Sequence, residues 1–412
     1  MVKFYSTLSR QIETFVPRRN GVVKMFTCGP SVYQRPHIGN FRTFIFEDIL
    51  QRYLEYLGYA VERVLNFTDV EDKAIAAATD EGIALSALSD RGAAWFYHDA
   101  DRLRIKPPAH NPRSSTSVDA AVSLIRQLLE QGSAYWYDSD IFFDPLKFPG
   151  FGKLFRLDMS RWPKTKRRFR KDTYPGVQWN RGDFILWHGY RTGDLVYWDT
   201  AIGRGRPSWN IQDPAMAVSC LGPEIDIACG GEDNLYRHHD YTIAIIESLT
   251  GREFAHYWFH GGHLLIDGQK MSKSRGNIID LDDLLQQGFS IEEIRFFLAG
   301  RHYRSRLNFT ARGLEKSREI LHHLRGLAAE LNPHGTPANT SPAAGKLSCI
   351  FREHMDNDLD LEGAVQEILV YLETLDDQRR RGELSAEESQ QIEGDLRKID
   401  SVLQCVFPAA RP

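Results

Sequence analysis

The sequence predicts an α/β protein in which an insertion splits a parallel sheet into two halves and a helical region follows. Three observations lead to this prediction. A strand-like run, a loop, an amphipathic helix and a second strand-like run follow one another over residues 22–66, the pattern of a βαβ unit. Residues 134–205 then interrupt this pattern with aromatic, strand-like pieces and turns. Strand-like runs with Gly-rich ends return at 224–231 and 256–266, and helical periodicity dominates after residue 278.

Each element of the βαβ unit has its own signal. Residues 22–29 are expected to form a buried strand, and residues 60–66 a second one. Between them, apolar residues recur at helical spacing over residues 41–58, where Gly58 is expected to end the helix. A further helix is expected at 236–249, between the two later strand-like runs.

The length and composition limit the class of protein. The chain has 412 residues, 42% of them hydrophobic and 26% charged, which excludes a mostly disordered protein and suits two or three domains. The net charge of −4 argues against binding nucleic acid by bulk positive charge. No apolar run reaches about 18 residues, so no membrane span is expected. The N-terminus has no signal-peptide pattern, and the scattered cysteines favour a reducing cytoplasm: Cys28, Cys220, Cys229, Cys349 and Cys405.

Composition also marks the boundaries between segments. Residues 332–346 are rich in Pro, Gly, Ser, Thr and Asn, as linkers are, and residues 347–407 show helical periodicity. We therefore expect a first half of the sheet domain at 1–133, an insertion at 134–205, a second half at 206–267, a loop and helical stem at 268–331, a linker at 332–346 and a C-terminal helical bundle at 347–412.

Two short motifs carry chemistry. His37-Ile38-Gly39-Asn40 opens the first predicted helix, where free N–H groups and the helix dipole suit a phosphate and Gly39 lets a nucleotide approach the backbone. Lys270-Met271-Ser272-Lys273-Ser274 brings two lysines that can neutralise charge on a phosphate under attack. Taken singly, the first is more often a loop histidine beside a turn glycine, and the second a solvated basic loop. Their order and their positions after the first and last strands make the pair far more specific.

Together, the motifs resemble the HIGH and KMSKS signatures of class I aminoacyl-tRNA synthetases. Further stretches are similar to the cysteinyl-tRNA synthetase family: Cys28–Tyr33, Pro36–Thr43, Asn66–Lys73, Arg206–Trp209, Gly230–Asp233, His238-His239 and His302–Ser305. The resemblance runs from about residue 20 to about residue 335. It implies a class I synthetase Rossmann-like parallel sheet split by an insertion, then an α-helical stem and a C-terminal helical bundle.

The resemblance also implies a reaction. An amino acid carboxylate attacks the α-phosphate of ATP, which comes with Mg²⁺, and gives an aminoacyl-adenylate and pyrophosphate. Because the carboxylate is already ionised, catalysis is positioning and charge stabilisation. His37 and Asn40 would hold the triphosphate, and Lys270 and Lys273 would stabilise the transition state. The implied nucleotide-binding residues are Gly39, Gly230, Gly231, Asp233, Met271, Ser272 and Ser274, and the implied substrate pocket is Cys28, Thr68, Trp209, Asp213, His238 and Thr242.

The implied metal site is altered in this sequence. The family holds zinc with two Cys, one His and one Glu, and the zinc binds the substrate thiolate. Cys28 and His238 keep two of these ligands, but Asp213 and Thr242 stand at the other two positions. Cys28, Asp213 and His238 could still bind zinc, since a carboxylate oxygen is an acceptable ligand. We expect a lost or weakened site, in which Asp213 faces a cationic or hydroxylated substrate group or bonds to Thr242.

Two features concern the molecule that accepts the activated amino acid. The family usually continues into an anticodon-binding module, whereas this sequence ends at Pro412, so anticodon reading is not expected. A mycothiol-pathway ligase that resembles the family also lacks this module, and it joins cysteine to an amino sugar instead of tRNA. The basic run at 164–171, with Trp162 and Phe169, could contact an RNA acceptor stem or be a solvated loop.

The favoured hypothesis is ATP-dependent activation of an amino acid, which is cysteine or another, and its transfer to tRNA or to a small amine. The alternatives are a genuine cysteine–tRNA ligase with a variant metal pocket, a ligase for a small-molecule amine, and a non-catalytic nucleotide-binding regulatory protein. Intact His37, Lys270 and Lys273 argue against the last. We expect a cytoplasmic monomer without a DNA or membrane partner.

Overall fold

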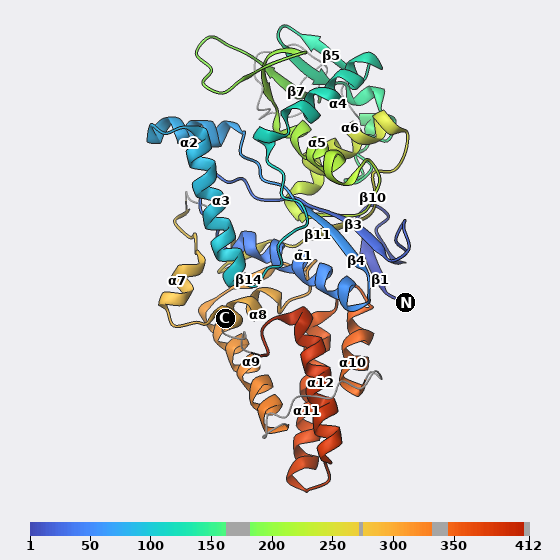
Figure 1. The fold of residues 1–412 in the computed structure, drawn as a ribbon, viewed down its shortest axis with the longest axis vertical. Helices are drawn as coiled ribbons and strands as arrows, with labels where there is room; N and C mark the ends of the chain where they lie inside the picture. Colours follow the sequence, from blue (N-terminus) through green and yellow to red (C-terminus); the bar gives the residue numbers. More distant parts are fainter. Residues whose placement is uncertain (162–181, 272–274, 332–344, 408–412) are drawn as a thin grey trace.

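The computed structural model describes residues 1–161, 182–271, 275–331 and 345–407. The described elements form three layers along the long axis of the molecule (Figure 1). The insertion lies at one end, the parallel sheet lies in the middle, and the C-terminal helices form the other end. The basic run at 164–171 and most of the predicted linker lie outside the described residues.

The middle layer is a four-stranded parallel sheet. Its strands are β3 (Val22–Thr27), β4 (Ala60–Leu65), β10 (Ile225–Gly231) and β11 (Ala255–Gly261), in the order β11-β10-β3-β4. Helix α1 (Ile38–Tyr56) connects β3 to β4, so the predicted βαβ unit is present. Every residue of β10 is buried, as expected for a strand covered on both faces.

The two faces of the sheet belong to two hydrophobic cores. Val23 and Met25 of β3 face a core that includes α1 and the C-terminal helices. Phe26 of β3 and Val64 of β4 face the other core, with α4 (Val118–Glu130), α5 (Trp209–Leu221), α6 (Asp240–Thr250) and the insertion. Because side chains alternate between the two faces along each strand, one face of the sheet packs against the C-terminal helices and the other against the insertion.

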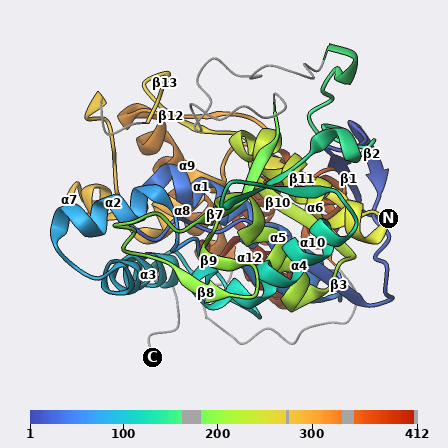
Figure 2. The same ribbon diagram turned by 90° about the horizontal axis from the view of Figure 1, so that it is seen from above.

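The insertion carries an antiparallel sheet of its own. Its five strands have the order β5-β6-β7-β9-β8. Their bounds are β5 Ala134–Tyr137, β6 Asp140–Phe143, β7 Phe184–Gly189, β8 Trp198–Thr200 and β9 Gly203–Pro207. Figure 2, which views the molecule from this end, shows these strands lying over α4 and α5.

The remaining helices flank the sheet or form the C-terminal end. Before the insertion, α2 (Asp72–Glu81) and α3 (Leu85–Arg102) follow β4. After the sheet come α7 (Leu281–Gln286), α8 (Ile291–Ala299), α9 (Ala311–Leu331), α10 (Lys346–Met355), α11 (Leu361–Arg380) and α12 (Ala386–Leu403). Among the helices that the structure describes, none combines the length and the apolar character needed to cross a bilayer.

Two predictions of local structure were wrong, and one element was not predicted. The helix expected at 236–249 begins at Asp240, because Tyr236 and Arg237 have non-helical backbone angles. The run at 256–266 is two strands in different sheets, since β12 (Leu264–Ile266) pairs with β13 (Gln269–Lys270) and β14 (Leu307–Phe309). A hairpin of β1 (Lys3–Ser6) and β2 (Gln11–Thr14) had no counterpart in the predictions.

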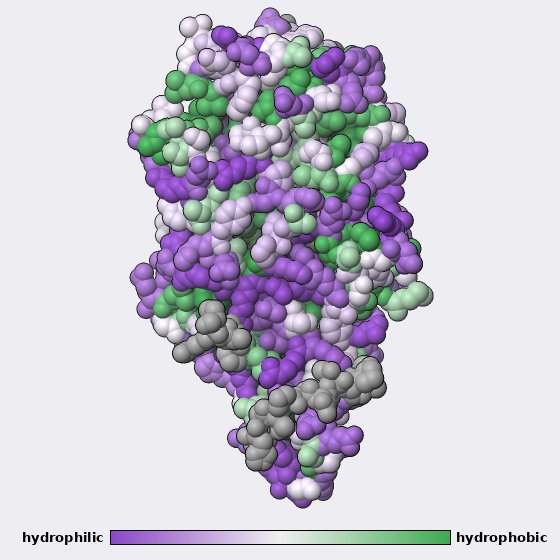
Figure 3. Space-filling model, in the orientation of Figure 1, coloured by the Kyte–Doolittle hydropathy of each residue, from purple (hydrophilic) through white to green (hydrophobic). Residues whose placement is uncertain are grey.

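Hydrophobic residues also reach the surface near the insertion. A groove lies between the α2–α3 turn and residues 195–198, and Leu195 and Tyr197 are exposed beside it. In Figure 3 hydrophobic residues gather on the part of this face that holds α2 and the insertion, whereas the centre is mainly hydrophilic.

Helix α1 also buries an acid against the sheet. The carboxyl of Glu47 is fully buried, and neither of its oxygens has a hydrogen-bond partner among the described residues. Burial raises the pKa of Glu47 to about 8, although the nearby Arg63 guanidinium lowers it in part. The side chain is therefore protonated in the folded chain at neutral pH.

Replacing Glu47 by Gln is expected to flatten the dependence of stability on pH. The unfolded chain releases this proton near pH 4.5, whereas the folded chain keeps it up to about pH 8. Between these values the free energy of unfolding falls by up to about 1.4 kcal/mol per pH unit, and the Glu47→Gln variant lacks this loss. Urea unfolding across this pH range measures the effect. Equal pH dependence in both proteins would contradict it.

Candidate active site

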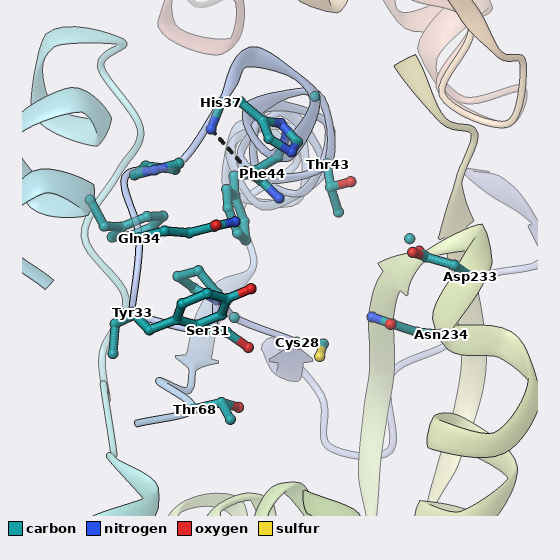
Figure 4. A pocket seen from close by; sticks show the side chains of 18 of the residues that line it. Cys28, Ser31, Tyr33, Gln34, His37, Thr43, Phe44, Thr68, Asp233 and Asn234 are labelled. Carbon is teal, nitrogen blue, oxygen red and sulfur yellow. Dashed lines mark hydrogen bonds between the residues drawn. The ribbon is translucent and has the colours of Figure 1, made fainter. Parts of the chain in front are cut away.

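A cavity of 390 Å³ opens at the carboxyl ends of the parallel strands. The N-terminal turn of α1 forms one wall, with His37, Gly39 and Asn40, and Lys270 and Met271 also line the cavity. In Figure 4, His37 lies above Cys28, and Asp233 and Asn234 lie on the side of the view opposite Tyr33 and Gln34. Both motifs therefore border one cavity, at the edge where doubly wound sheets bind their ligands.

A capping box fixes the start of α1. The Asn40 N–H donates to Nδ1 of His37 at 3.2 Å, and the His37 N–H donates to Oδ1 of Asn40 at 3.0 Å. This box extends the helix to Ile38, three residues before the expected start. Burial lowers the pKa of His37, so the ring is neutral near pH 7. Because Nδ1 accepts a hydrogen bond, Nε2 carries the proton and can donate to a phosphate oxygen.

The two motifs touch each other at Gly39. A Cβ atom at Gly39 would lie 3.1 Å from the His37 ring and 3.6 Å from Cε of Met271. The Ile38 N–H donates to the carbonyl oxygen of Ile279 at 3.0 Å, which ties the helix to the segment after the second motif. A side chain at Gly39 would be tight against the His37 ring and would reach Met271 at an ordinary van der Waals distance. Lys273, Ser272 and Ser274 lie outside the described residues.

The end of β10 contributes the opposite wall. Gly231 and Asp233 line the cavity, together with Asn234. Gly230 is not on this wall: a Cβ atom there would lie 2.7 Å from Cε1 of His239, so the glycine allows close packing behind the strand. Of the predicted substrate-pocket residues, Cys28, Thr68 and Trp209 line the cavity.

The other pocket residues lie buried behind Cys28. The side chains of Asp213 and His238 are each 1% exposed, and Nε2–H of His238 donates to Oδ2 of Asp213 at 2.7 Å. Sγ of Cys28 lies 3.5 Å from the same nitrogen. The structure therefore brings together the three residues that the sequence offered as zinc ligands. Burial, and then the Asp213 carboxylate, raise the pKa of the Cys28 thiol well above its ordinary value.

Asp213 is held from a second side. Nδ2 of Asn66 donates to Oδ1 of Asp213 at 2.8 Å, and Oδ1 of Asn66 accepts from the Gly29 N–H at 2.9 Å. The Trp209 ring stacks on the His238 ring with centroids 4.0 Å apart. Each carboxylate oxygen thus has a donor, and the whole base of the pocket is one hydrogen-bonded unit.

These residues do not fit the four-ligand zinc site. Two ligand atoms on one tetrahedral zinc lie about 3.3 Å apart or more, given metal–ligand bonds of about 2.0–2.2 Å. The 2.7 Å separation in the Asp213–His238 pair is that of a hydrogen bond. At the fourth position, the Thr242 hydroxyl donates to the His238 carbonyl oxygen at 3.0 Å.

Sequence reasoning missed His239. Cys28, His238 and His239 each bring one possible ligand atom within 4.8 Å of the others. Nδ1 of His239 lies 2.8 Å from Nε2 of His260, and Nδ1 of His260 lies 2.9 Å from the Thr7 hydroxyl. Burial lowers the pKa of both histidines, that of His260 to about 3, so both rings are neutral. The adjacent histidines 238 and 239 could have indicated a second buried histidine at the pocket base, but the residues that His239 and His260 contact lie far away in the sequence.

Comparison with known proteins identifies the family to which this chain is similar. The family described as "tRNA synthetases class I (C) catalytic domain" matches residues 14–319. The Cysteine--tRNA ligase of Chlamydia pneumoniae is 38% identical over 409 residues, covering 97% of this chain and 85% of that protein. The Cysteine--tRNA ligase of Solibacter usitatus is 36% identical over 421 residues, covering 100% of this chain and 88% of that protein.

Solved structures with the same fold are more distant. Mycobacterium tuberculosis methionyl-tRNA synthetase in complex with methionyl-adenylate has a TM-score of 0.66 at 17% identity, covering 93% of this chain and 90% of that one. The Agrobacterium radiobacter K84 agnB2 LeuRS has a TM-score of 0.68 at 11% identity, covering 94% and 85%. The predicted class I synthetase fold is thereby confirmed.

Restoring the two missing ligands should restore zinc. The double variant Asp213→Cys/Thr242→Glu supplies a second thiolate and a carboxylate beside Cys28 and His238, and it should bind about one zinc per chain, as a complete ligand set does. Elemental analysis after dialysis against a weak chelator measures the zinc content, with Thr242→Glu alone as the matched control. Unchanged zinc in the double variant would mean that position 213 or 242 does not face the pocket base.

Proposed function

This chain belongs to the cysteinyl-tRNA synthetase family, whose members are ligases, and from that premise we propose that it activates an amino acid with ATP and transfers it to a tRNA. The observation that carries the proposal is the convergence of His37, Asn40 and Lys270 on one cavity. A proton donor at the start of a helix and a lysine in the lining of the same cavity suit a triphosphate.

In the first step, a carboxylate oxygen of the amino acid attacks the α-phosphorus of ATP. The bond from this phosphorus to the bridging oxygen breaks, and pyrophosphate leaves with the Mg²⁺ that accompanied ATP. No proton has to be removed, so His37 and Asn40 serve by holding phosphate oxygens and Lys270 by neutralising the negative charge that develops. In the second step a tRNA hydroxyl attacks the carbonyl carbon of the adenylate, the bond from this carbon to the phosphate oxygen breaks, and AMP leaves with its phosphate taking up the hydroxyl proton.

The side-chain pocket would select its amino acid without a metal. Cys28, Thr68 and Trp209 line the cavity, and the Asp213–His238 pair backs Cys28. Such a pocket distinguishes substrates by shape and hydrogen bonds, whereas a zinc site distinguishes a thiolate from a hydroxyl by the strength of a metal bond. We propose that the departures at Asp213 and Thr242 change how the amino acid is chosen and leave adenylate chemistry intact.

A genuine cysteine–tRNA ligase with a variant pocket is the second candidate. The 38% identity to the Chlamydia pneumoniae Cysteine--tRNA ligase, over 97% of this chain, favours it. The two candidates differ in their selectivity for cysteine. Both use ATP, form an aminoacyl-adenylate and transfer the amino acid to tRNA.

Amino-acid-dependent exchange of pyrophosphate into ATP, measured for all twenty amino acids without RNA, tests the proposal. We expect exchange with at least one amino acid. Exchange with cysteine alone, followed by charging of cysteine tRNA, would establish the second candidate. Exchange with a different amino acid would make positions 213 and 242 determinants of specificity. No exchange with any of the twenty would contradict the proposed activation step.

Substitution of Lys270 separates transition-state stabilisation from binding. Lys270→Ala should lower the rate constant of adenylate formation by about 10²–10³, the usual loss for one charge-stabilising group. The dissociation constant for ATP should change little, because the lysine acts on charge that develops during attack. Single-turnover kinetics and ATP titration measure the two quantities, with the exposed Lys316→Ala on α9 as control. An equal loss in the rate constant and in the affinity for ATP would mean that Lys270 stabilises bound ATP rather than the transition state.

A further inference from the structure

Four charged side chains form a closed ring beside the active site. Nη2 of Arg35 lies 3.1 Å from Oδ1 of Asp99, and Nη1 of Arg35 lies 2.6 Å from Oδ2 of Asp282. Nη1 of Arg102 lies 2.7 Å from Oδ1 of Asp282 and 3.3 Å from Oδ1 of Asp99. Positive and negative groups therefore alternate around the ring, and each contacts two of opposite sign.

The ring joins three segments of the chain. Arg35 lies two residues before His37, Asp99 and Arg102 lie on α3, and Asp282 lies in the first turn of α7, shortly after the second motif. Figure 2 shows α3 and α7 at the same side of the molecule. The ring thus bridges the loop before α1 and the segment after Lys270, with α3 as the common support.

The burial of Asp99 makes the ring a firm constraint. Its side chain is fully buried, whereas Arg35, Arg102 and Asp282 are partly exposed. A buried carboxylate is stable only when opposite charges and hydrogen bonds compensate for its lost hydration, so Asp99 holds both arginines in place. Hydrogen bonds from Arg35 and then Arg102 lower the pKa of Asp282 to about 2, so this member stays charged at neutral pH.

Two neighbouring contacts depend on the same alignment. The Ile38 N–H donates to the Ile279 carbonyl oxygen at 3.0 Å, three residues before Asp282. On the cavity side, Met271 packs near Gly39. Movement of α7 away from Arg35 would therefore pull Ile279 away from Ile38, in the first turn of α1.

We propose that the Arg35–Asp99–Arg102–Asp282 ring sets the distance between the two phosphate-binding segments, which makes Arg35 and Asp282 positioning residues for adenylate formation. They act through His37 and Lys270 and do not touch the substrate. The inference rests on the proposed function. Its physical basis is that a displacement of about 1 Å in the groups around a reacting centre can lower a rate by about 10².

The test uses two single variants and their double variant in the full chain. Arg35→Met and Asp282→Asn should each lower kcat for pyrophosphate exchange about tenfold, with KM for the amino acid unchanged, because neither residue lines the cavity that holds Cys28, Thr68 and Trp209. The double variant should be hardly worse than either single variant, since both substitutions remove the same Arg35–Asp282 contact between the loop before α1 and α7. Asp282→Glu, which keeps the charge, should recover most of kcat.

A matched control removes a different ion pair from the same helix. Arg91 on α3 pairs with Glu81 at 2.7 Å, outside the ring, and Arg91→Met should leave kcat unchanged. Thermal unfolding and active-site titration of every variant separate lost stability from lost rate. Wild-type kcat in folded Arg35→Met and Asp282→Asn would overturn the positioning role and leave the proposed function standing. No exchange by the unaltered chain would overturn both.

Discussion

The base of the substrate pocket depends on one buried carboxylate, that of Asp213. A carboxyl group with 1% exposure is tolerated only if hydrogen bonds replace its lost water. Asn66 and His238 supply these hydrogen bonds, and through them Asp213 connects the end of β4, helix α5 and the turn before α6. The His238 ring that bonds to Asp213 also stacks on Trp209 and contacts Cys28. The pocket is therefore closed by hydrogen bonds where the family resemblance implies a metal.

The phosphate side of the site obeys a separate constraint. The His37–Asn40 capping box uses Nδ1 of the histidine, and this leaves Nε2–H as the donor toward the cavity. The same turn is linked to the second motif through Ile38 and Gly39. The residues that we propose to bind phosphate thus form a unit with its own hydrogen bonds, separate from those of Asp213. Under the proposed function, this separation would let the side-chain pocket change while the groups proposed to hold ATP stay in place.

The sequence anticipated what local periodicity and motif order encode. It predicted the βαβ unit, the insertion that splits the sheet, and the position of both motifs at one edge of that sheet. It did not anticipate contacts between distant positions, such as His239 with His260 or Arg35 with Asp282, because neither pair has a local pattern. The start of α6 was misplaced because apolar spacing cannot reveal the non-helical angles at Arg237. The close packing of Gly230 against His239 was not anticipated either, and a role for Gly230 at the nucleotide stays a prediction.

We propose that hydrogen bonds close the base of the pocket without a metal ion. Anomalous diffraction at the zinc edge, from crystals of the unaltered chain grown with equimolar zinc, tests it most directly. The account predicts no anomalous peak between Cys28 and His238, and continuous density for the Asp213–His238 hydrogen bond. A strong peak at about 2.3 Å from Sγ of Cys28, the length of a zinc–sulfur bond, would contradict it.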